Sequence, residues 1–319
     1  NLTREEIEHE AIVLDVDAET AKSIKGQARI SLFYENCKVG EIEPEEVYSP
    51  NKNDALEKLF GTKDETHPGV TFFLNMKNFL IGGPVHLNER VASEYGKYDL
   101  SPAQTRDIFK KLGWKTVAGF QTRNVPHRAH EHLQRVALEL TDGLFIQPLV
   151  GWKKRGDYTP DAILLGYKAM LDEFYPSDRV VMGVLATSMR YAGPREAVFH
   201  ALIRRNYGCT HFVVGRDHAG VGNFYGKYEA QQLAIRLSDE LGIEILPLHG
   251  PYFCQKCGVV TSAKTCRHEE DAPEVITHIS GTDMRDILMG GREPDPHIMR
   301  AEVIAALRDV DIFIEETES

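Results

Sequence analysis

The sequence contains no long apolar run and no secretion signal. No stretch reaches about 18 consecutive apolar residues, the length that indicates a transmembrane helix, so we expect no membrane span. The first eleven residues, NLTREEIEHEA, are acidic and polar, whereas a signal peptide begins with basic residues followed by apolar ones. An initiator methionine is also absent, so we expect the chain to begin within a longer gene product.

Several common catalytic motifs are missing as well. The absence of G-x-x-x-x-G-K-S/T excludes a P-loop kinase, alone or fused to this chain. No G-x-G-x-x-G follows the first strand of the predicted sheet, which argues against dinucleotide redox chemistry. The G-x-S-x-G elbow of the α/β-hydrolases is absent too. These absences leave enzymes that need neither a P-loop nor a serine nucleophile.

The composition is that of an ordinary globular protein. Of 319 residues, 42% are hydrophobic and 27% are charged, and this length predicts two domains with a small third one. The net charge of -11 argues against nucleic acid as the main partner, because phosphate backbones require a basic face. It is compatible with a small anionic substrate held by a local group of cations.

The chain is expected to contain three parts. Residues 1–95 carry short alternating apolar runs, such as AIVLDVD (11–17) and VTFFLNMKNFLIGGPVHL (70–87), split by Gly, Asn and Pro. They predict a small β-rich N-terminal domain. Residues 96–248 predict a catalytic α/β domain, and residues 249–319 a small C-terminal subdomain that contains a cysteine cluster.

The pattern after residue 96 predicts a parallel sheet covered by helices. The expected strands span 115–121, 143–151, 179–186, 210–215 and 243–248. The expected helices span 101–113, 128–141, 160–175, 194–208 and 227–242, with a final one over 297–310. Repeated βα units give a doubly wound, Rossmann-like parallel sheet. Ligands bind such sheets beyond the carboxyl ends of the strands, which nominates the loops 121–128, 151–159, 186–194 and 215–226.

The first of these loops gathers donors and cations. After the strand come Gln121, Arg123 and Asn124, which can donate to oxyanions, and then His127 and His130 at the start of a helix. Residues three apart share a helix face, and a helix N-terminus favours negative charge. The two imidazoles could therefore both donate to a phosphate group. The alternative is that the histidines cap the helix or pack where two domains meet.

Two further loops have similar character. GRDHAGVGNFYG (215–226) combines three glycines with Arg216 and His218, and ATSMRYAGPREA (186–197) contains Arg190 and Arg195. The alternatives are a tight turn with an Arg216–Asp217 pair, and a helix start with arginines in solvent. Together the three loops predict a pocket for a polyanion. Because they provide cations without a nucleophile or base, they favour transfer at phosphorus by positioning and charge stabilisation.

The cysteines predict a metal site in the C-terminal part. Cys254, Cys257, Cys266 and His268 follow the pattern C-x2-C-x8-C-x-H, which suits a closed tetrahedral structural zinc site. The alternative is three buried free thiols. Clustered cysteines without a secretion signal favour a metal over disulfides, and a reducing, cytoplasmic setting.

Four motifs in order resemble those of the ATP sulfurylase (sulfate adenylyltransferase) family. They are QTRNVPHRAHE (121–131), MRYAGPREAVFHA (189–201), GRDHAGVGNFYG (215–226) and ISGTDMR (279–285). The resemblance extends from about Ile12 to the C-terminus. It implies that ATP and sulfate form adenosine 5′-phosphosulfate and pyrophosphate, with Mg²⁺ accompanying ATP, and that a sulfate oxygen attacks the α-phosphorus in line. It also implies a homo-oligomer, with a dimer favoured.

The resemblance assigns roles to individual residues. Sulfate would contact Gln121, Arg123, Arg216 and the backbone of Ala219. Thr122, Arg123, Asn124, His127 and His130 would act at the reaction centre, the two histidines stabilising the transition state and the leaving pyrophosphate. ATP would contact Gln121, Thr122, Arg123, Asn124, Gly215, Arg216, Asp217, His218 and Pro251, and a mobile lid would lie at Met189–Arg190.

The chain departs from the family pattern in two places. Val125 separates Asn124 from Pro126, where the family has Pro directly after Asn, so we expect a small backbone adjustment. Family members also carry several dozen more residues before the position of residue 1, so the N-terminal domain, PUA-like by this resemblance, is expected to be incomplete. The zinc segment is similar to that of a prokaryotic subset of the family.

Two other functions are compatible with parts of the sequence. One is an adenylyltransferase of the H-x-G-H class that acts on a different anionic acceptor. The other is a zinc-knuckle interaction module with a degenerate nucleotide fold, although a scaffold has no need of these donor clusters. A dependence of pyrophosphate release on sulfate would separate them from the first hypothesis.

Overall fold

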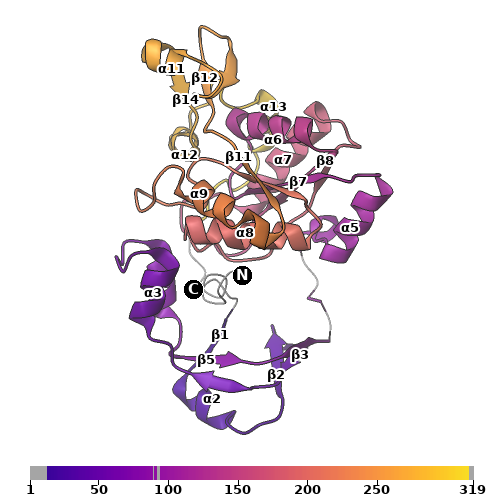
Figure 1. Ribbon diagram of the computed structural model, residues 1–319, viewed down its shortest axis with the longest axis vertical. Helices are drawn as coiled ribbons and strands as arrows, with labels where there is room; N and C mark the ends of the chain where they lie inside the picture. Colours follow the sequence, from indigo (N-terminus) through magenta and orange to yellow (C-terminus); the bar gives the residue numbers. More distant parts are fainter. Residues whose placement is uncertain (1–12, 89, 92–93, 316–319) are drawn as a thin grey trace. The chain divides into compact units, whose positions relative to one another are not determined.

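The computed structural model describes residues 13–88, 90–91 and 94–315, and it divides into two compact units, Asn1–Gly96 and Lys97–Ser319 (Figure 1). The acidic first residues discussed above lie outside the described part. Among the described residues, no helix is both long and apolar enough to cross a membrane. The three-domain division with limits at 95 and 248 stays a prediction.

The first unit is built from two small antiparallel sheets, of order β1-β5-β4 and β2-β3-β6. Its strands are β1 (Leu14–Val16), β2 (Ile30–Tyr34), β3 (Cys37–Ile42), β4 (Glu46–Tyr48), β5 (Phe79–Gly82) and β6 (Val85–Leu87). Its helices are α2 (Ala18–Ser23), α3 (Lys52–Phe60) and α4 (Pro68–Asn75). Val16, Ala21, Ile24, Ile42 and Ile81 form a small buried core. The β-rich character expected for this unit is confirmed.

One apolar run of this unit does not form the strand that was predicted. The run 70–87 begins inside helix α4, and only its later part forms β5 and β6. The buried side chain of His67 caps the helix by accepting hydrogen bonds from the backbone N–H groups of Gly69 and Val70, and Pro68 occupies the first turn. These capping residues outweigh the strand preference of the β-branched and aromatic side chains that follow.

The second unit contains the expected parallel sheet, of order β11-β10-β7-β8-β9. The strands are β7 (Val117–Thr122), β8 (Gly143–Pro148), β9 (Val180–Met182), β10 (His211–Val214) and β11 (Glu244–Pro247). The chain starts in the middle at β7, moves outward to β9, and then returns to β10 on the other side of β7. The predicted α/β fold class is confirmed. The strand order reverses between β7 and β10, where ligands bind in such folds.

Helices connect successive strands. They are α5 (Pro102–Lys111), α6 (Arg128–Leu140), α7 (Pro160–Phe174), α8 (Pro194–Asn206), α9 (Glu229–Arg236) and α10 (Ser238–Leu241). Helices α5 and α7 begin where the sequence predicts, with Ser101 and Thr159 as caps and proline in the first turn. Helix α7 packs against α13 (Ala301–Ala306), and α8 packs against α9 (Figure 1). Buried residues of β7 and β8 form one core with α6, α7 and α13.

The C-terminal part adds a small antiparallel sheet and three helices (Figure 1). It contains β12 (Tyr252–Cys254), β13 (Val259–Thr261), α11 (His268–Asp271), β14 (Ile276–His278), α12 (Gly281–Met289) and α13. Helix α13 is shorter than predicted over 297–310. The carbonyl of Ile298 accepts a hydrogen bond from the backbone N–H of Arg128 at the start of α6, so it is engaged outside a helix.

The start of β8 generates a stability prediction. A Cβ atom at Gly143 would lie 2.2 Å from the ring of Trp114, a buried side chain that cannot move aside. Gly143→Ala is therefore expected to lower the free energy of unfolding by about 1–3 kcal/mol in urea denaturation. Gly226→Ala is the control, because its Cβ would meet no atom closer than 3.6 Å. Equal stability of the two variants would contradict this packing.

Candidate active site

A cavity lies beyond the carboxyl ends of β7 and β10, where the strand order reverses. It is lined by residues of both strand ends, of α6, and of the segments 250–251 and 279–285. Every residue proposed above for catalysis or substrate binding lines it, namely Gln121, Thr122, Arg123, Asn124, His127, His130, Gly215, Arg216, Asp217, His218, Ala219 and Pro251. The fold therefore brings together segments separated by more than a hundred residues, while their individual roles stay predictions.

The loop after β7 is held by its own residues and by the core. The Thr122 hydroxyl donates to the Asn124 carbonyl (3.2 Å) and accepts from the Asn124 backbone N–H (3.1 Å). Val125 is fully buried in the main core, and Pro126 lies against Gly166 of α7, where a Cβ would be 2.9 Å from the proline ring. Val125, where the sequence departs from the family pattern, is thus an apolar anchor that fixes the path from Asn124 to His127.

The two histidines of this loop stack at the start of α6. Their ring centroids lie 3.8 Å apart at an interplanar angle of 16°. His127 Nδ1 accepts a hydrogen bond from the backbone N–H of His130 (3.3 Å), so the neutral ring of His127 carries its proton on Nε2. Burial, followed by the neighbouring His130, lowers the pKa of His127 well below its usual value, and burial lowers the pKa of His130 to about 4. His127 therefore both caps the helix and lines the cavity.

Arg123 is fixed by contacts on three sides. Its guanidinium donates to the Gly220 carbonyl (3.1 Å), lies over the ring of Tyr191 (4.9 Å to the centroid), and approaches Asp157 at 3.9 Å. The planar group is thereby held in one orientation at the cavity wall. A pre-oriented guanidinium loses little conformational entropy when it binds an oxyanion.

Asp157 is a fully buried carboxylate on which several of these groups converge. It lies 3.2 Å from Lys154 Nζ and 3.3 Å from Arg285 Nη1, and it accepts a 2.7 Å hydrogen bond from the Tyr191 hydroxyl. Burial raises the pKa of Asp157, but Arg123, Lys154, the Tyr191 hydroxyl and Arg285 together lower it below the usual value. The carboxylate is therefore ionised at neutral pH and acts as a shared counter-ion.

The loop after β10 has an unusual backbone. Asp217 and Ala219 have positive φ angles of 53° and 56°, which are rare for residues other than glycine. Replacing Gly220 would require the Asp217 side chain or the loop to move, because a Cβ atom added at Gly220 would lie 2.0 Å from Asp217 Oδ1. Strained residues of this kind cluster at ligand sites. The tight turn of the alternative is present, and the charge of Arg216 acts on Asp217, but the described side chains of these two residues form no ion pair within 4.0 Å.

The loop 186–194 contributes less to the cavity wall than predicted. Met189 is buried and lines the cavity, whereas the described residues Arg190 and Arg195 do not line it. The guanidinium of Arg190 donates to the Ser188 carbonyl (3.3 Å) and lies over the ring of Phe199 (5.2 Å to the centroid). Of the described residues of this loop, Met189 and not the two arginines therefore contributes to the predicted pocket.

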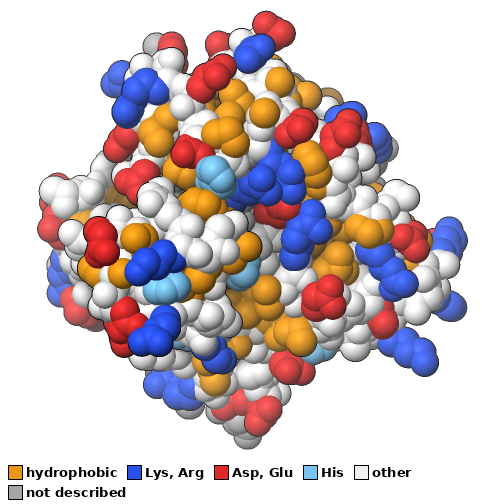
Figure 2. All heavy atoms as spheres, turned by 90° about the horizontal axis from the view of Figure 1, so that it is seen from above, with side chains coloured by type: hydrophobic (Ala, Val, Ile, Leu, Met, Phe, Trp, Pro, Cys, Tyr) orange, Lys and Arg blue, Asp and Glu red, His pale blue; other side chains and the backbone are white. Residues whose placement is uncertain are grey.

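The charge in the cavity suits a polyanion. The cations Arg123, Arg216 and Arg285 line it, and Asp217 carries the only carboxylate among the described lining residues. Burial raises the pKa of Asp217, whereas the charges of Arg123 and Arg216 lower it. Figure 2 shows blue Lys and Arg side chains beside pale blue histidines near the middle of one face. The local charge therefore opposes the net charge of -11 of the chain.

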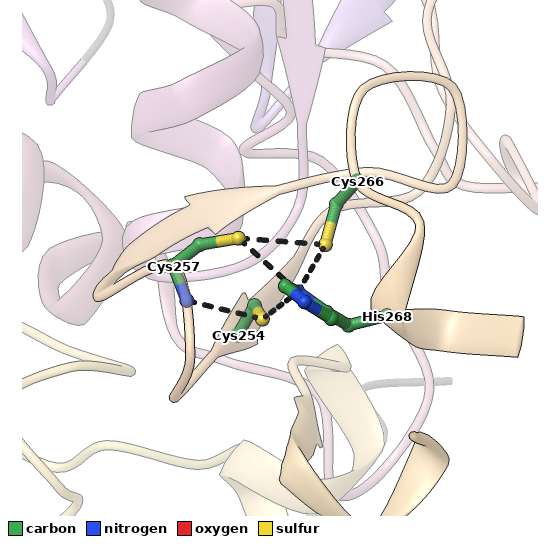
Figure 3. A group of neighbouring side chains, drawn as sticks. All are labelled: Cys254, Cys257, Cys266 and His268. Atoms are coloured by element: carbon green, nitrogen blue, oxygen red, sulfur yellow. Dashed lines mark hydrogen bonds between the residues drawn. The ribbon is translucent and has the colours of Figure 1, made fainter. Parts of the chain in front are cut away.

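The four residues predicted to bind metal point toward one another (Figure 3). Cys257 Sγ lies 3.7 Å from Cys266 Sγ and 3.4 Å from His268 Nδ1, and Cys254 Sγ lies 3.4 Å from the same nitrogen. A tetrahedral zinc site places its ligand atoms about 3.4–3.8 Å apart. The cluster has the donor set and the spacing to hold a metal ion, and it lies outside the cavity.

Comparisons with known proteins agree with this geometry. A family model described as ATP-sulfurylase matches residues 96–310, and a model of a PUA-like domain matches residues 11–90. A relative named sulfate adenylyltransferase from Hyperthermus butylicus is 45% identical, over 97% of this chain and 78% of the relative. Another of the same name, from Ignicoccus hospitalis, is 46% identical over 92% of this chain and 75% of the relative.

The chain belongs to the sulfate adenylyltransferase family.

A solved structure supports the fold of this family member. The hexameric APS kinase from Thiobacillus denitrificans matches with a TM-score of 0.68 at 17% identity. The match covers 93% of this chain and 52% of that longer chain, so this chain spans about half of its length. At this identity the likeness concerns the fold alone.

Sequence reasoning missed several residues around the site of this family member. Arg285 lines the cavity and donates to Asn124 Oδ1 at 3.3 Å, and Asp157 and Tyr191 lie behind Arg123. Lys153 is also buried here, with its Nζ donating to the Leu149 carbonyl at 3.1 Å. Arg285 could have been identified from the sequence, because it is the last residue of the quoted motif ISGTDMR. No sequence motif links Asp157 to Arg285.

The buried histidines predict a loss of stability in acid. The pKa of such a histidine is lower in the folded protein than its unfolded value of about 6.5. At a pH between the two values, the histidine is neutral in the folded protein and protonated in the unfolded chain. Stability is therefore lost as pH falls from about 6.5 toward the folded pKa of about 4. Between pH 7 and pH 5, the free energy of unfolding measured in urea is expected to fall by up to about 2 kcal/mol less in His130→Gln than in the wild type.

The control is His297→Gln, which replaces an exposed histidine and is expected to follow the wild type. If the wild type and His130→Gln lost the same stability between these two pH values, the explanation from burial would be wrong.

Proposed function

We propose that the chain transfers the adenylyl group of ATP to sulfate and so forms adenosine 5′-phosphosulfate and pyrophosphate. The observation that carries the proposal is the cavity at the reversal of strand order. In a chain of this family, it combines three guanidinium groups and two stacked histidines with a single carboxylate. Such a site suits two anions that must approach each other.

The sulfate subsite comprises Gln121, Arg123 and the backbone of Ala219, with Arg216 assisting. Arg123 supports this assignment because its guanidinium is already oriented by Gly220 and Tyr191. Sulfate is fully ionised at neutral pH, so no general base is required. This agrees with a cavity whose only described carboxylate is Asp217.

ATP binds in the same cavity and shares Gln121, Arg123 and Arg216 with sulfate. Its proposed contacts are Gln121, Thr122, Arg123, Asn124, Gly215, Arg216, Asp217, His218 and Pro251, all of which line the cavity. Thr122 and Asn124 lie at the end of β7 and act on the phosphates at the reaction centre. The segment 215–218 borders the nucleoside, and the backbone near Pro251 faces the adenine.

The reaction is an in-line displacement at the α-phosphorus. A sulfate oxygen forms the new P–O bond, and the bond to the bridging oxygen of the β-phosphate breaks, so pyrophosphate leaves with that electron pair. The negative charge that develops on the leaving group needs donors. Because His127 Nδ1 accepts a bond from the helix, its Nε2–H is free to donate to a phosphate oxygen. His130, stacked on His127, is the second residue proposed to stabilise the leaving pyrophosphate.

Two metal ions belong to the proposal. Mg²⁺ enters with ATP and neutralises part of the triphosphate charge. The residues Cys254, Cys257, Cys266 and His268 would hold a structural zinc ion, because three thiolates and an imidazole fill all four positions. We also propose a homodimer in a reducing, cytoplasmic setting, where thiolates remain available to the metal.

The proposal is tested by sulfate-dependent exchange between ATP and labelled pyrophosphate, with molybdate as an alternative acceptor. Arg123→Ala is expected to lower kcat/KM for sulfate by about 10²–10³-fold, since it removes an oriented charge. Arg308→Ala replaces an exposed arginine far along the sequence and is the control. Exchange that does not depend on sulfate would refute the proposal, and unchanged turnover of Arg123→Ala would refute the sulfate subsite.

Metal removal gives a separate prediction. Cys257→Ser is expected to lose bound zinc, measured by elemental analysis, and to lower Tm, while exchange activity persists at low temperature. Cys37→Ser, at an exposed cysteine outside the cluster, is the control and is expected to keep the metal. A Cys257→Ser protein that retained one zinc per chain, or a folded, zinc-free protein without any activity, would contradict this assignment.

A further inference from the structure

Three buried polar side chains form a chain that ends at the cavity. Glu196 and His200 lie on helix α8, one turn apart, and His218 lies in the loop after β10. His200 Nδ1 lies 3.1 Å from His218 Nε2, and His200 Nε2 lies 3.7 Å from Glu196 Oε1. Glu196 and His200 have no exposed surface. Of the three described residues, His218 alone lines the cavity.

Glu196 is oriented by the main chain before α8. One carboxylate oxygen accepts a hydrogen bond from the backbone N–H of Arg190 and the other from that of Ala192, each at 3.0 Å. Burial raises the pKa of Glu196 above its usual value, whereas these two N–H groups and the charges of Arg190 and Arg123 lower it. Both oxygens act as acceptors, which is the hydrogen-bonding pattern of an ionised carboxylate. The carboxylate faces Nε2 of His200 across 3.7 Å, which is longer than a hydrogen bond, and this buried nitrogen has no hydrogen-bond partner.

This arrangement selects one tautomer of each ring. Burial lowers the pKa of His200 well below its usual value and that of His218 to about 3, so each neutral ring carries one proton. The carboxylate favours the proton on Nε2 of His200, which leaves Nδ1 as an acceptor. His218 must then donate from Nε2 to complete the 3.1 Å contact. Nδ1 of His218 is left with a lone pair and no proton.

An acceptor in the cavity wall cannot bind a phosphate or sulfate oxygen, because those groups carry no hydrogen to donate at neutral pH. It can accept from a hydroxyl or an amino group. We propose that Glu196 and His200 are positioning residues that hold His218 as a hydrogen-bond acceptor for a donor on the nucleoside of ATP, either a ribose hydroxyl or the adenine amino group. The inference rests on the proposed function, since it takes ATP as the ligand.

The test compares ATP with three analogues that each lack one donor: 2′-deoxy-ATP, 3′-deoxy-ATP and purine riboside triphosphate. The wild type is expected to prefer ATP over at least one of them by about tenfold in kcat/KM. In His200→Leu this preference is expected to fall to about twofold or less, because His218 can then adopt either tautomer. KM for sulfate is expected to change less than KM for ATP, which a general loss of structure would not produce.

Two more variants sharpen the comparison. Glu196→Gln removes the charge that selects the tautomer and is expected to reduce the same preference, so it carries the test if His200→Leu does not fold. His211→Leu makes the matched substitution at the opposite end of β10, where His211 pairs with Glu244 at 3.1 Å, and is expected to keep the wild-type preference. If neither site variant alters the preference for any analogue, the inference is overturned.

Calorimetric binding of ATP and the analogues without sulfate separates this inference from the proposed function. One outcome is that the site variants lose the preference for ATP over the analogues in binding, while ATP–pyrophosphate exchange does not depend on sulfate. It would support the inference and refute the sulfate reaction. Sulfate-dependent exchange with an unchanged preference in both site variants would support the reaction and refute the inference.

Discussion

The site depends on the burial of one carboxylate among several cations. Asp157 is fully buried and lies within 4 Å of charged groups on Arg123, Lys154 and Arg285. A buried charge without partners is strongly destabilising, so folding requires these cations to converge on it. They come from the loop after β7, from the loop after β8 and from α12. One electrostatic requirement thereby fixes the positions of groups that are distant in sequence.

This convergence leaves an excess of positive charge. Asp157 balances one of its cationic neighbours, and burial keeps the stacked His127 and His130 neutral in the free protein. Anionic ligands balance this excess positive charge when they bind. The cations are already in position and offset the repulsion between the two anions. Because the guanidinium groups are already oriented, little reorganisation is needed when the anions bind. The acidity of the rest of the chain is compatible with this, since its charges lie outside the cavity.

The sequence predicted what depends on short-range order. The strand that ends within one residue of Gln121, the helix that starts after His127 and the spacing of Cys254 and Cys257 all belong to local patterns, and the structure shows them. The partners of Asp157 could not be predicted, because Arg285 lies 128 residues away and no local pattern links the two. Helix α4 was missed for a different reason: the capping by His67 outweighed a strand-like run.

The C-terminal part connects the metal cluster with the cavity through one pair of strands. Pro251 in the cavity wall directly precedes β12, and Ile279 directly follows β14. Tyr252 pairs with His278 at this end, whereas Cys254, a ligand of the cluster, lies at the other end of β12. The strand pair nearest the cavity therefore contains no ligand of the cluster, whereas two of the cysteines, Cys254 and Cys266, belong to the small apolar core of this sheet. A metal ion there would stabilise the sheet that holds both cavity segments without taking part in the chemistry.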